Sequence, residues 1–102
     1  MRKFIISIDA GTTSNRAILF DLKGKPIFSS QKEFTQFFPK SGWVEHNPEE
    51  IWNTTKKVLK DVILKAKRFK GKILTIGITN QRETTVLWDK KTGKTVYRAI
   101  VW

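Results

Sequence analysis

Two short apolar runs open the chain, and a polar segment separates them. Residues 4–8 are almost continuously apolar and lead into Asp9, and residues 17–20 form a second run that leads into Asp21. Apolar runs of this length, bounded by polar residues, are typical of β-strands. We therefore predict an antiparallel hairpin whose connection lies within residues 10–16.

A third strand is predicted at residues 27–34, where apolar and polar positions alternate loosely. The turn before it contains Gly24, which can adopt a positive φ, and Pro26, which cannot donate a hydrogen bond to a neighbouring strand. Because so few residues separate this strand from residues 17–20, the pattern predicts a three-stranded antiparallel meander.

The segment after Asn47 has the periodicity of a long helix. Asn47 can cap its start, Pro48 suits the first helical position, and Glu50 would complete a capping box. Apolar positions then recur every three or four residues and would pack on the sheet as one stripe: Ile51, Thr55, Val58, Leu59, Val62, Ile63 and Ala66. Gly71 is the expected end of the helix.

A further strand is expected at residues 72–79, so the helix would be a crossover between strands of one sheet. This strand leads into a dense polar cluster, residues 80–85, at the kind of strand end where open α/β sheets place ligands. A hairpin around residues 90–94 and an apolar strand at residues 99–102 follow. The predicted fold class is α/β: a three-stranded antiparallel meander, a crossover helix and further strands. The last strand has no predicted partner, and an unpaired apolar edge is prone to association.

The length of 102 residues suits one small domain rather than a two-lobed enzyme. The absence of cysteine excludes disulfides and thiolate metal sites, and a single histidine leaves little for a zinc site built from imidazoles. The first residues, Met1-Arg2-Lys3 before a run of only five mostly apolar residues, predict neither a signal peptide nor a membrane span. We expect a cytoplasmic location.

The formal net charge of +11 raises the alternative of a basic nucleic-acid-binding domain. Residues 56–72 carry seven lysines and one arginine against one aspartate, on the predicted helix and just after it. Since these cations interleave with the apolar stripe, a solvated lysine-rich helix surface is the favoured interpretation.

The segment between the first two strands has the composition of a phosphate-binding turn. Gly11 lets the backbone approach a ligand closely, and the N–H groups of such a turn can point the same way. Three hydroxyl residues follow it: Thr12, Thr13 and Ser14. Arg16 adds a guanidinium that matches phosphate geometry, and Asp9 is placed to hold a hydrated divalent cation. An ordinary polar hairpin turn is the alternative.

Arg82 and Glu83, in the polar cluster after residue 79, have the chemistry to bind a polyol. The guanidinium donates hydrogen bonds to hydroxyl oxygens, and the carboxylate accepts them from hydroxyl protons. The alternative is a surface ion pair without function. His46, the only histidine, has no catalytic partner nearby in the sequence, and we interpret it as structural.

Four motifs together resemble the amino-terminal part of the FGGY carbohydrate kinase family, in particular its glycerol kinases, over essentially the whole chain. They are residues 9–16, 42–48, 77–84 and 99–102. The acidic residue with Gly-Thr-Thr-Ser is shared across the family, whereas Gln-Arg-Glu-Thr at residues 81–84 distinguishes glycerol kinases. Two departures are visible: Ala10 stands where the family often has Gln, and Asn15 where it often has Ser.

The resemblance implies a ribonuclease H-like domain of the actin and hexokinase type, which the family repeats twice around an active-site cleft. Residues 1–102 would be the amino-terminal part of the first domain, with the second domain absent. The implied activity is ATP- and Mg²⁺-dependent phosphorylation of glycerol to sn-glycerol 3-phosphate. The implied partners are glycerol and ATP and not nucleic acid, and the oligomers of the family depend largely on later segments.

The resemblance also implies roles for individual residues. The ATP phosphates would be held by Thr12, Thr13, Ser14 and Arg16, and Mg²⁺, through water, by Asp9. Glycerol would be held by Arg82, Glu83 and Trp102. The aspartate base of the family lies beyond Trp102, so the chain contains no catalytic residue and is expected to be inactive alone. A non-catalytic nucleotide- or phosphate-binding module is the main alternative.

Overall fold

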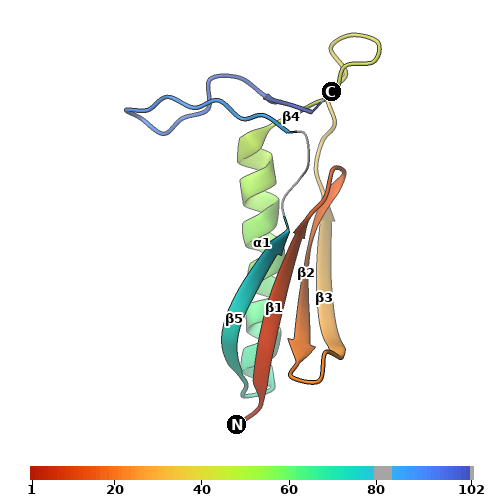
Figure 1. Cartoon of the computed structure of the whole chain (residues 1–102), viewed down its shortest axis with the longest axis vertical. Coiled ribbons are helices and arrows are strands. Elements are labelled where there is room, and N and C mark those ends of the chain that lie inside the picture. The colour runs from red at the N-terminus through yellow and green to blue at the C-terminus, as the bar shows by residue number, and fades with distance from the viewer. Residues whose placement is uncertain (80–83, 102) are drawn as a thin grey trace.

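The computed structural model describes residues 1–79 and 84–101, in which a four-stranded sheet packs against one helix (Figure 1). The sheet contains β1 (Lys3–Ala10), β2 (Ser14–Asp21), β3 (Pro26–Glu33) and β5 (Lys72–Thr79), in the order β3-β2-β1-β5. The helix is α1 (Pro48–Arg68), and a small second sheet pairs β4 (Glu45–His46) with β6 (Ala99–Ile100). The predicted α/β fold class is confirmed.

Strand β1 lies inside the main sheet and is paired on both sides. It runs antiparallel to β2, with Ile6 opposite Leu19, and parallel to β5, with Ile6 beside Ile76. Strand β3 runs antiparallel to β2. The predicted meander is therefore confirmed, and so is the crossover, because α1 carries the chain from β3 at one edge to β5 at the other.

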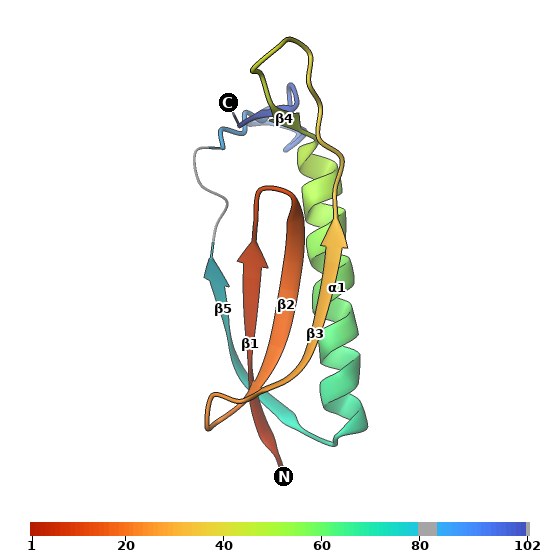
Figure 2. The ribbon, with the colours of Figure 1, turned by 90° about the vertical axis from the view of Figure 1, so that its right-hand side faces the viewer.

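Helix α1 lies mainly over β2 and β3 (Figure 2). Its buried residues follow a strict four-residue spacing: Thr54, Val58, Val62 and Ala66. Thr54 lies outside the predicted stripe, whereas Leu59 and Ile63 of that stripe pack beside the buried row. The sheet contributes the rest of the core: Phe4, Ile6, Ile8, Ala17 and Leu19. Because α1 barely reaches β5, Ile76 and Ile78 remain 41% and 72% exposed.

Asn47 caps the start of α1 as predicted, whereas Glu50 does not. The Asn47 side chain accepts a hydrogen bond from the Glu49 N–H at 3.0 Å, and Pro48 occupies the first turn. Glu50 does not close a capping box: its Oε1 accepts from the N–H and the hydroxyl of Thr35, at 2.6 and 2.9 Å. Glu50 therefore ties the loop after β3 to the helix.

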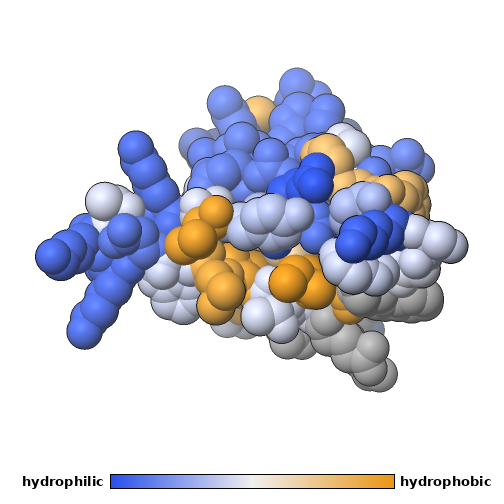
Figure 3. Space-filling view, turned by 90° about the horizontal axis from the view of Figure 1, so that it is seen from above, coloured by the Kyte–Doolittle hydropathy of each residue, from blue (hydrophilic) through white to orange (hydrophobic). Residues whose placement is uncertain are grey.

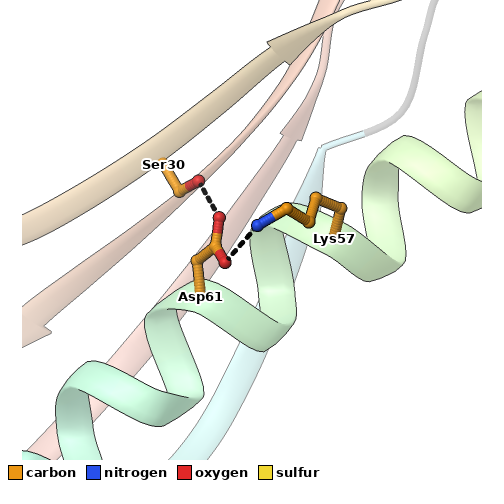
Figure 4. A network of polar contacts seen from close by, with 3 residues as sticks. All are labelled: Ser30, Lys57 and Asp61. Carbon is orange, nitrogen blue, oxygen red and sulfur yellow. Dashed lines mark hydrogen bonds and ion pairs between the residues drawn. The ribbon is translucent and has the colours of Figure 1, made fainter.

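A polar network holds the middle of α1 against β3 (Figure 4). The Ser30 hydroxyl donates to Oδ2 of Asp61, and the Lys57 ammonium donates to Oδ1, both at 2.7 Å. Both hydrogen bonds lower the pKa of Asp61, and the one from Lys57 has the larger effect. The network lies at the margin of the apolar core, where it helps to fix the helix position along the sheet.

Gly71 has a different role from the one predicted. Helix α1 ends at Arg68, and Lys70 rather than Gly71 takes the left-handed conformation, with φ 52°. The Gly71 N–H donates to the Ala66 carbonyl at 2.9 Å. The ring of Phe4 fills the space that a β-carbon on residue 71 would occupy. A glycine is therefore required here for packing between β1 and the helix exit.

The carboxyl-terminal segment is paired with the rest of the chain. Ala99 and Ile100 pair with His46 and Glu45, and the Val101 N–H donates to the Val44 carbonyl at 2.9 Å. The prediction of an unpartnered last strand is thus wrong for residues 99–101, because the segment before α1 supplies the partner. The predicted hairpin around residues 90–94 forms a turn closed by an isolated bridge between Trp88 and Thr95.

His46 is fully buried on β4, and its ring meets that of Phe34 edge-on with centroids 4.8 Å apart. Burial lowers the pKa of His46 below its ordinary value of 6.5, although the Glu50 carboxylate offsets part of this effect. The imidazole is therefore neutral at pH 7.

Within the described residues, no helix is both long and apolar enough to cross a membrane.

Substitution of Gly71 tests the close approach of Phe4. We expect Gly71→Ala to lower the free energy of unfolding by about 1–3 kcal/mol, because the new methyl group overlaps a buried ring that cannot move aside freely. Gly77→Ala is the matched control, since no atom lies within 4 Å of a β-carbon there. Urea unfolding measures both. Equal stability of the two variants would contradict the packing role of Gly71.

The buried imidazole predicts a pH dependence of stability. The folded state binds a proton on His46 more weakly than the unfolded chain does. The neutral imidazole therefore contributes fully to the free energy of unfolding above pH 6.5, and this contribution is lost as the pH falls through the lowered pKa of His46. Urea midpoints at about pH 7.5 and about pH 5 should show this fall. His46→Gln, which cannot titrate, should show a smaller one. Identical falls in the two proteins would refute the assignment to His46.

Candidate functional site

The turn between β1 and β2 is shorter than the predicted connection, because β1 runs through Ala10 and β2 begins at Ser14. The Gly11 N–H donates to the Ser14 carbonyl at 3.0 Å and closes the turn. A β-carbon on Gly11 would lie 2.9 Å from that carbonyl oxygen, so the tight closure requires glycine. Three residues, 11–13, thus connect the two strands at one end of the sheet.

The hydroxyl residues of the turn are accessible. Thr12 and Thr13 are exposed, and Ser14 is half-buried, its Oγ accepting from the exposed Gln31 amide at 2.7 Å. Thr12 and Thr13 also line a cavity of about 260 Å³ that Gln36, His46 and Val101 help to form. These side chains can therefore reach an anionic ligand without disturbing the core.

Asp9 and Arg16 face each other across the hairpin at the base of the turn. They are register partners, and their Oδ2 and Nη2 atoms are 3.6 Å apart. Their neighbours Ile8, Asn15 and Ala17 are buried toward α1, so Asp9 and Arg16 lie on the opposite face of the sheet. Both side chains are about half exposed, at 50% and 46%. Such an exposed pair is worth under about 1 kcal/mol and is easily exchanged for ligand contacts.

The surroundings of Asp9 decide what kind of metal binding it can support. Among residues 1–79 and 84–101, no group of three or more His, Cys, Asp or Glu side chains could hold a metal ion. Mg²⁺ commonly keeps several waters and binds one or two carboxylates together with phosphate oxygens. A single exposed carboxylate beside the predicted phosphate-binding turn fits that arrangement and does not fit a cation held by protein ligands alone.

Asn15 is a site feature that the sequence pattern did not assign. It is fully buried, and its Nδ2 donates to the Ile51 carbonyl at 3.0 Å and to the Thr54 hydroxyl at 2.7 Å. Its Oδ1 has no hydrogen-bond partner in the described part of the chain. Asn15 therefore anchors the start of β2 to the first turns of α1. The sequence did contain a signal for this role. Asn15 is an amide at an inward-facing position of β2, whereas the other inward-facing positions, Ala17 and Leu19, are apolar.

The loop after β3 lies behind the turn and binds its carbonyl groups. The Phe34 N–H donates to the Thr13 carbonyl at 3.2 Å, and the Gln36 Nε2 donates to the Thr12 carbonyl at 3.1 Å. The Gln36 Oε1 lies 2.6 Å from the Nε2 of His46. Sequence reasoning missed Gln36 and left His46 without a partner, because contacts between distant loops leave no periodic pattern.

The predicted glycerol-binding residues Arg82, Glu83 and Trp102 lie outside the described residues. The sheet topology nevertheless places their chain neighbours near the turn. Parallel pairing sets Thr79, the end of β5, beside Asp9. A second cavity, of about 400 Å³, is lined by residues from β1, α1 and β5 together with Thr84 and Val86. Figure 3 views the molecule from this end and shows hydrophobic side chains between hydrophilic ones.

The chain is similar to known proteins over almost its whole length. The N-terminal domain of the FGGY family of carbohydrate kinases matches residues 4–102. The chain is 60% identical to a glycerol kinase of Alkaliphilus metalliredigens over 102 residues, and 59% identical to one of Lactococcus lactis over 99 residues. These alignments cover 100% and 97% of the chain, but the chain spans only 20% of the length of either relative.

Solved structures show the same fold. The crystal structure of Plasmodium falciparum glycerol kinase with ADP matches 99% of the chain with a TM-score of 0.87 and 36% identity. The xylulose kinase of Rhodospirillum rubrum matches 96% of the chain with a TM-score of 0.87 and 28% identity. The chain covers 20% of each of these structures, which share the actin and hexokinase type of fold. On these matches, the chain belongs to the FGGY family of carbohydrate kinases.

Proposed function

We propose that this chain is the amino-terminal part of an ATP-dependent glycerol kinase that makes sn-glycerol 3-phosphate. The observation that carries the proposal is the similarity of about 60% over the whole chain to proteins named glycerol kinase. Among the structural neighbours, identity is 36% with a glycerol kinase, 28% with a xylulose kinase and 25% with a gluconate kinase. This order favours glycerol over a sugar or sugar acid as the acceptor.

In the proposed reaction, the turn holds the phosphates of ATP. The hydroxyl groups and the cation at its base have the chemistry for phosphate oxygens: Thr12, Thr13, Ser14 and Arg16. Arg16 can leave its weak pair with Asp9 to meet a phosphate, because both side chains are half exposed. Gly11 keeps this part of the backbone compact enough for close approach.

Asp9 is the proposed ligand, through water, of a Mg²⁺ ion that accompanies ATP. When bound, this ion would neutralise part of the negative charge on the phosphate oxygens. The carboxylate of Asp9 is 50% exposed at the end of β1, so it can accept hydrogen bonds from hydrating waters without a desolvation cost.

The proposed acceptor site uses Arg82, Glu83 and Trp102, with the polar pair on the glycerol hydroxyls and the indole against the carbon chain. The aspartate base and the second domain would be supplied by sequence outside residues 1–102, so these residues alone are proposed to be inactive. Because ATP is the proposed donor, the cytoplasm is the proposed place of action. A phosphate-binding module without transfer is the competing function.

A chimera tests the proposal. The chain replaces the matching fifth of the Alkaliphilus metalliredigens glycerol kinase, and ADP release is followed by a coupled-enzyme assay. We expect glycerol-dependent turnover from the chimera and none from the chain alone. Arg82→Ala should lower kcat/KM for glycerol by roughly 10- to 100-fold, the effect of losing hydrogen bonds from a charged group. Arg68→Ala, at the exposed end of α1, is the matched control and should have no effect.

The outcomes separate the competing functions. Turnover that is independent of glycerol, or indifferent to Arg82, would overturn the proposed acceptor site. Binding of MgATP without turnover in the chimera would favour the phosphate-binding module. A gel shift with duplex DNA at low salt that weakens as salt is added would instead favour the basic nucleic-acid-binding alternative.

A further inference from the structure

We infer that Gln36 and His46 are positioning residues that hold the phosphate-binding turn in its working conformation. The inference rests on the proposed function and adds two residues to it. Neither residue belongs to the turn, and neither lies on β1 or β2. Both line the cavity that Thr12 and Thr13 also line, which places them directly behind the proposed phosphate site.

The contacts form a chain of hydrogen bonds from β4 to the turn. The His46 Nε2 and the Gln36 Oε1 are 2.6 Å apart, and the Gln36 Nε2 donates to the Thr12 carbonyl at 3.1 Å. Since the Gln36 oxygen can only accept, His46 must carry its proton on Nε2. The neutral imidazole, favoured by burial, is therefore in the Nε2–H form.

Holding the Thr12 carbonyl fixes the direction of the next N–H group. The peptide between Thr12 and Thr13 is planar and trans, so its carbonyl and its N–H point in opposite directions. When Gln36 binds this carbonyl, the Thr13 N–H points away from the loop. The Phe34 N–H acts in the same way on the Thr13 carbonyl, at 3.2 Å, and so orients the following peptide. Donors oriented in advance bind an anion without a further ordering cost.

The residues that hold the turn are themselves firmly placed. His46 is fully buried against the Phe34 ring, and its strand β4 pairs with β6. The loop between β3 and β4 is fixed by hydrogen bonds of its backbone: the Thr35 N–H donates to the Glu50 carboxylate at 2.6 Å, and Phe37 and Glu45 exchange two backbone hydrogen bonds, both at 2.9 Å. The position of Gln36 is thus set by elements other than the turn that it supports.

Kinetics of the chimera described above test the inference. Gln36→Met keeps the side-chain length but removes the side-chain hydrogen bonds to Thr12, Phe34 and His46, and we expect it to raise the KM for MgATP by about 5- to 10-fold. The kcat and the KM for glycerol should change by less than about twofold, because the affected contact serves nucleotide binding. Thr35→Val is the matched control: it removes a hydrogen bond of the same loop that points to α1, and the KM for MgATP should not change.

Variants of His46 separate positioning from a packing role. His46→Gln can place an amide N–H near the original Nε2 and should keep the KM for MgATP within about twofold. The leucine of His46→Leu cannot donate a hydrogen bond to Gln36, so this variant should raise the KM for MgATP as much as Gln36→Met does. If His46→Leu does not fold, Gln36→Met decides the question. In the 102-residue chain itself, imidazole ¹⁵N shifts should report the Nε2–H form of His46.

The result that would overturn the inference is an unchanged KM for MgATP in Gln36→Met while the unsubstituted chimera phosphorylates glycerol. An equal rise in Thr35→Val would also overturn it, because the effect would then come from the loop as a whole. Absence of glycerol-dependent turnover in the unsubstituted chimera would overturn the proposed function, and this inference with it.

Discussion

The placement of β1 between β2 and β5 is the constraint on which the rest of the structure depends. Antiparallel pairing with β2 puts a tight turn at the carboxyl end of β1, and parallel pairing with β5 makes that strand end at the same edge. The turn after β1 and the end of β5 at Thr79, far apart in the sequence, are thereby brought to one end of the sheet. The apolar residues on the helix side of β1, Phe4, Ile6 and Ile8, keep this arrangement in place through the core.

The main elements could be predicted from the sequence because their signals are local. Apolar runs bounded by polar residues identified the strands, and the spacing of Val58, Val62 and Ala66 identified the helix face. Asn47 and Pro48 marked its start correctly. The return of the chain to the sheet through a crossover helix was predicted from the general rule for such connections, whereas the choice of β1 as the parallel partner of β5 came only from the structure.

Other features could not be predicted because they depend on contacts between distant residues. Glycine is needed at position 71 because of the ring of Phe4, while Lys70 takes the left-handed conformation at the helix exit, and Glu50 binds Thr35 rather than the helix backbone. The last segment gained a partner, β4, that has only two residues and no periodic signal. In the candidate site, the turn residues were visible as a motif, whereas Asn15, Gln36 and His46 contribute through hydrogen bonds across 10 to 39 positions of the chain.

The uneven cover of the sheet by α1 has a mechanical consequence. Separating β2 from the helix would expose the centre of the core, whereas a displacement of the carboxyl end of β5 would uncover little apolar surface, because Ile76 and Ile78 are already 41% and 72% exposed. The softest deformation of this sheet is therefore a shift of its β5 edge relative to a rigid β1–β2 hairpin. The proposed phosphate side of the site lies on the stiff part of the domain, and the strand that leads to the proposed acceptor residues lies on the compliant part.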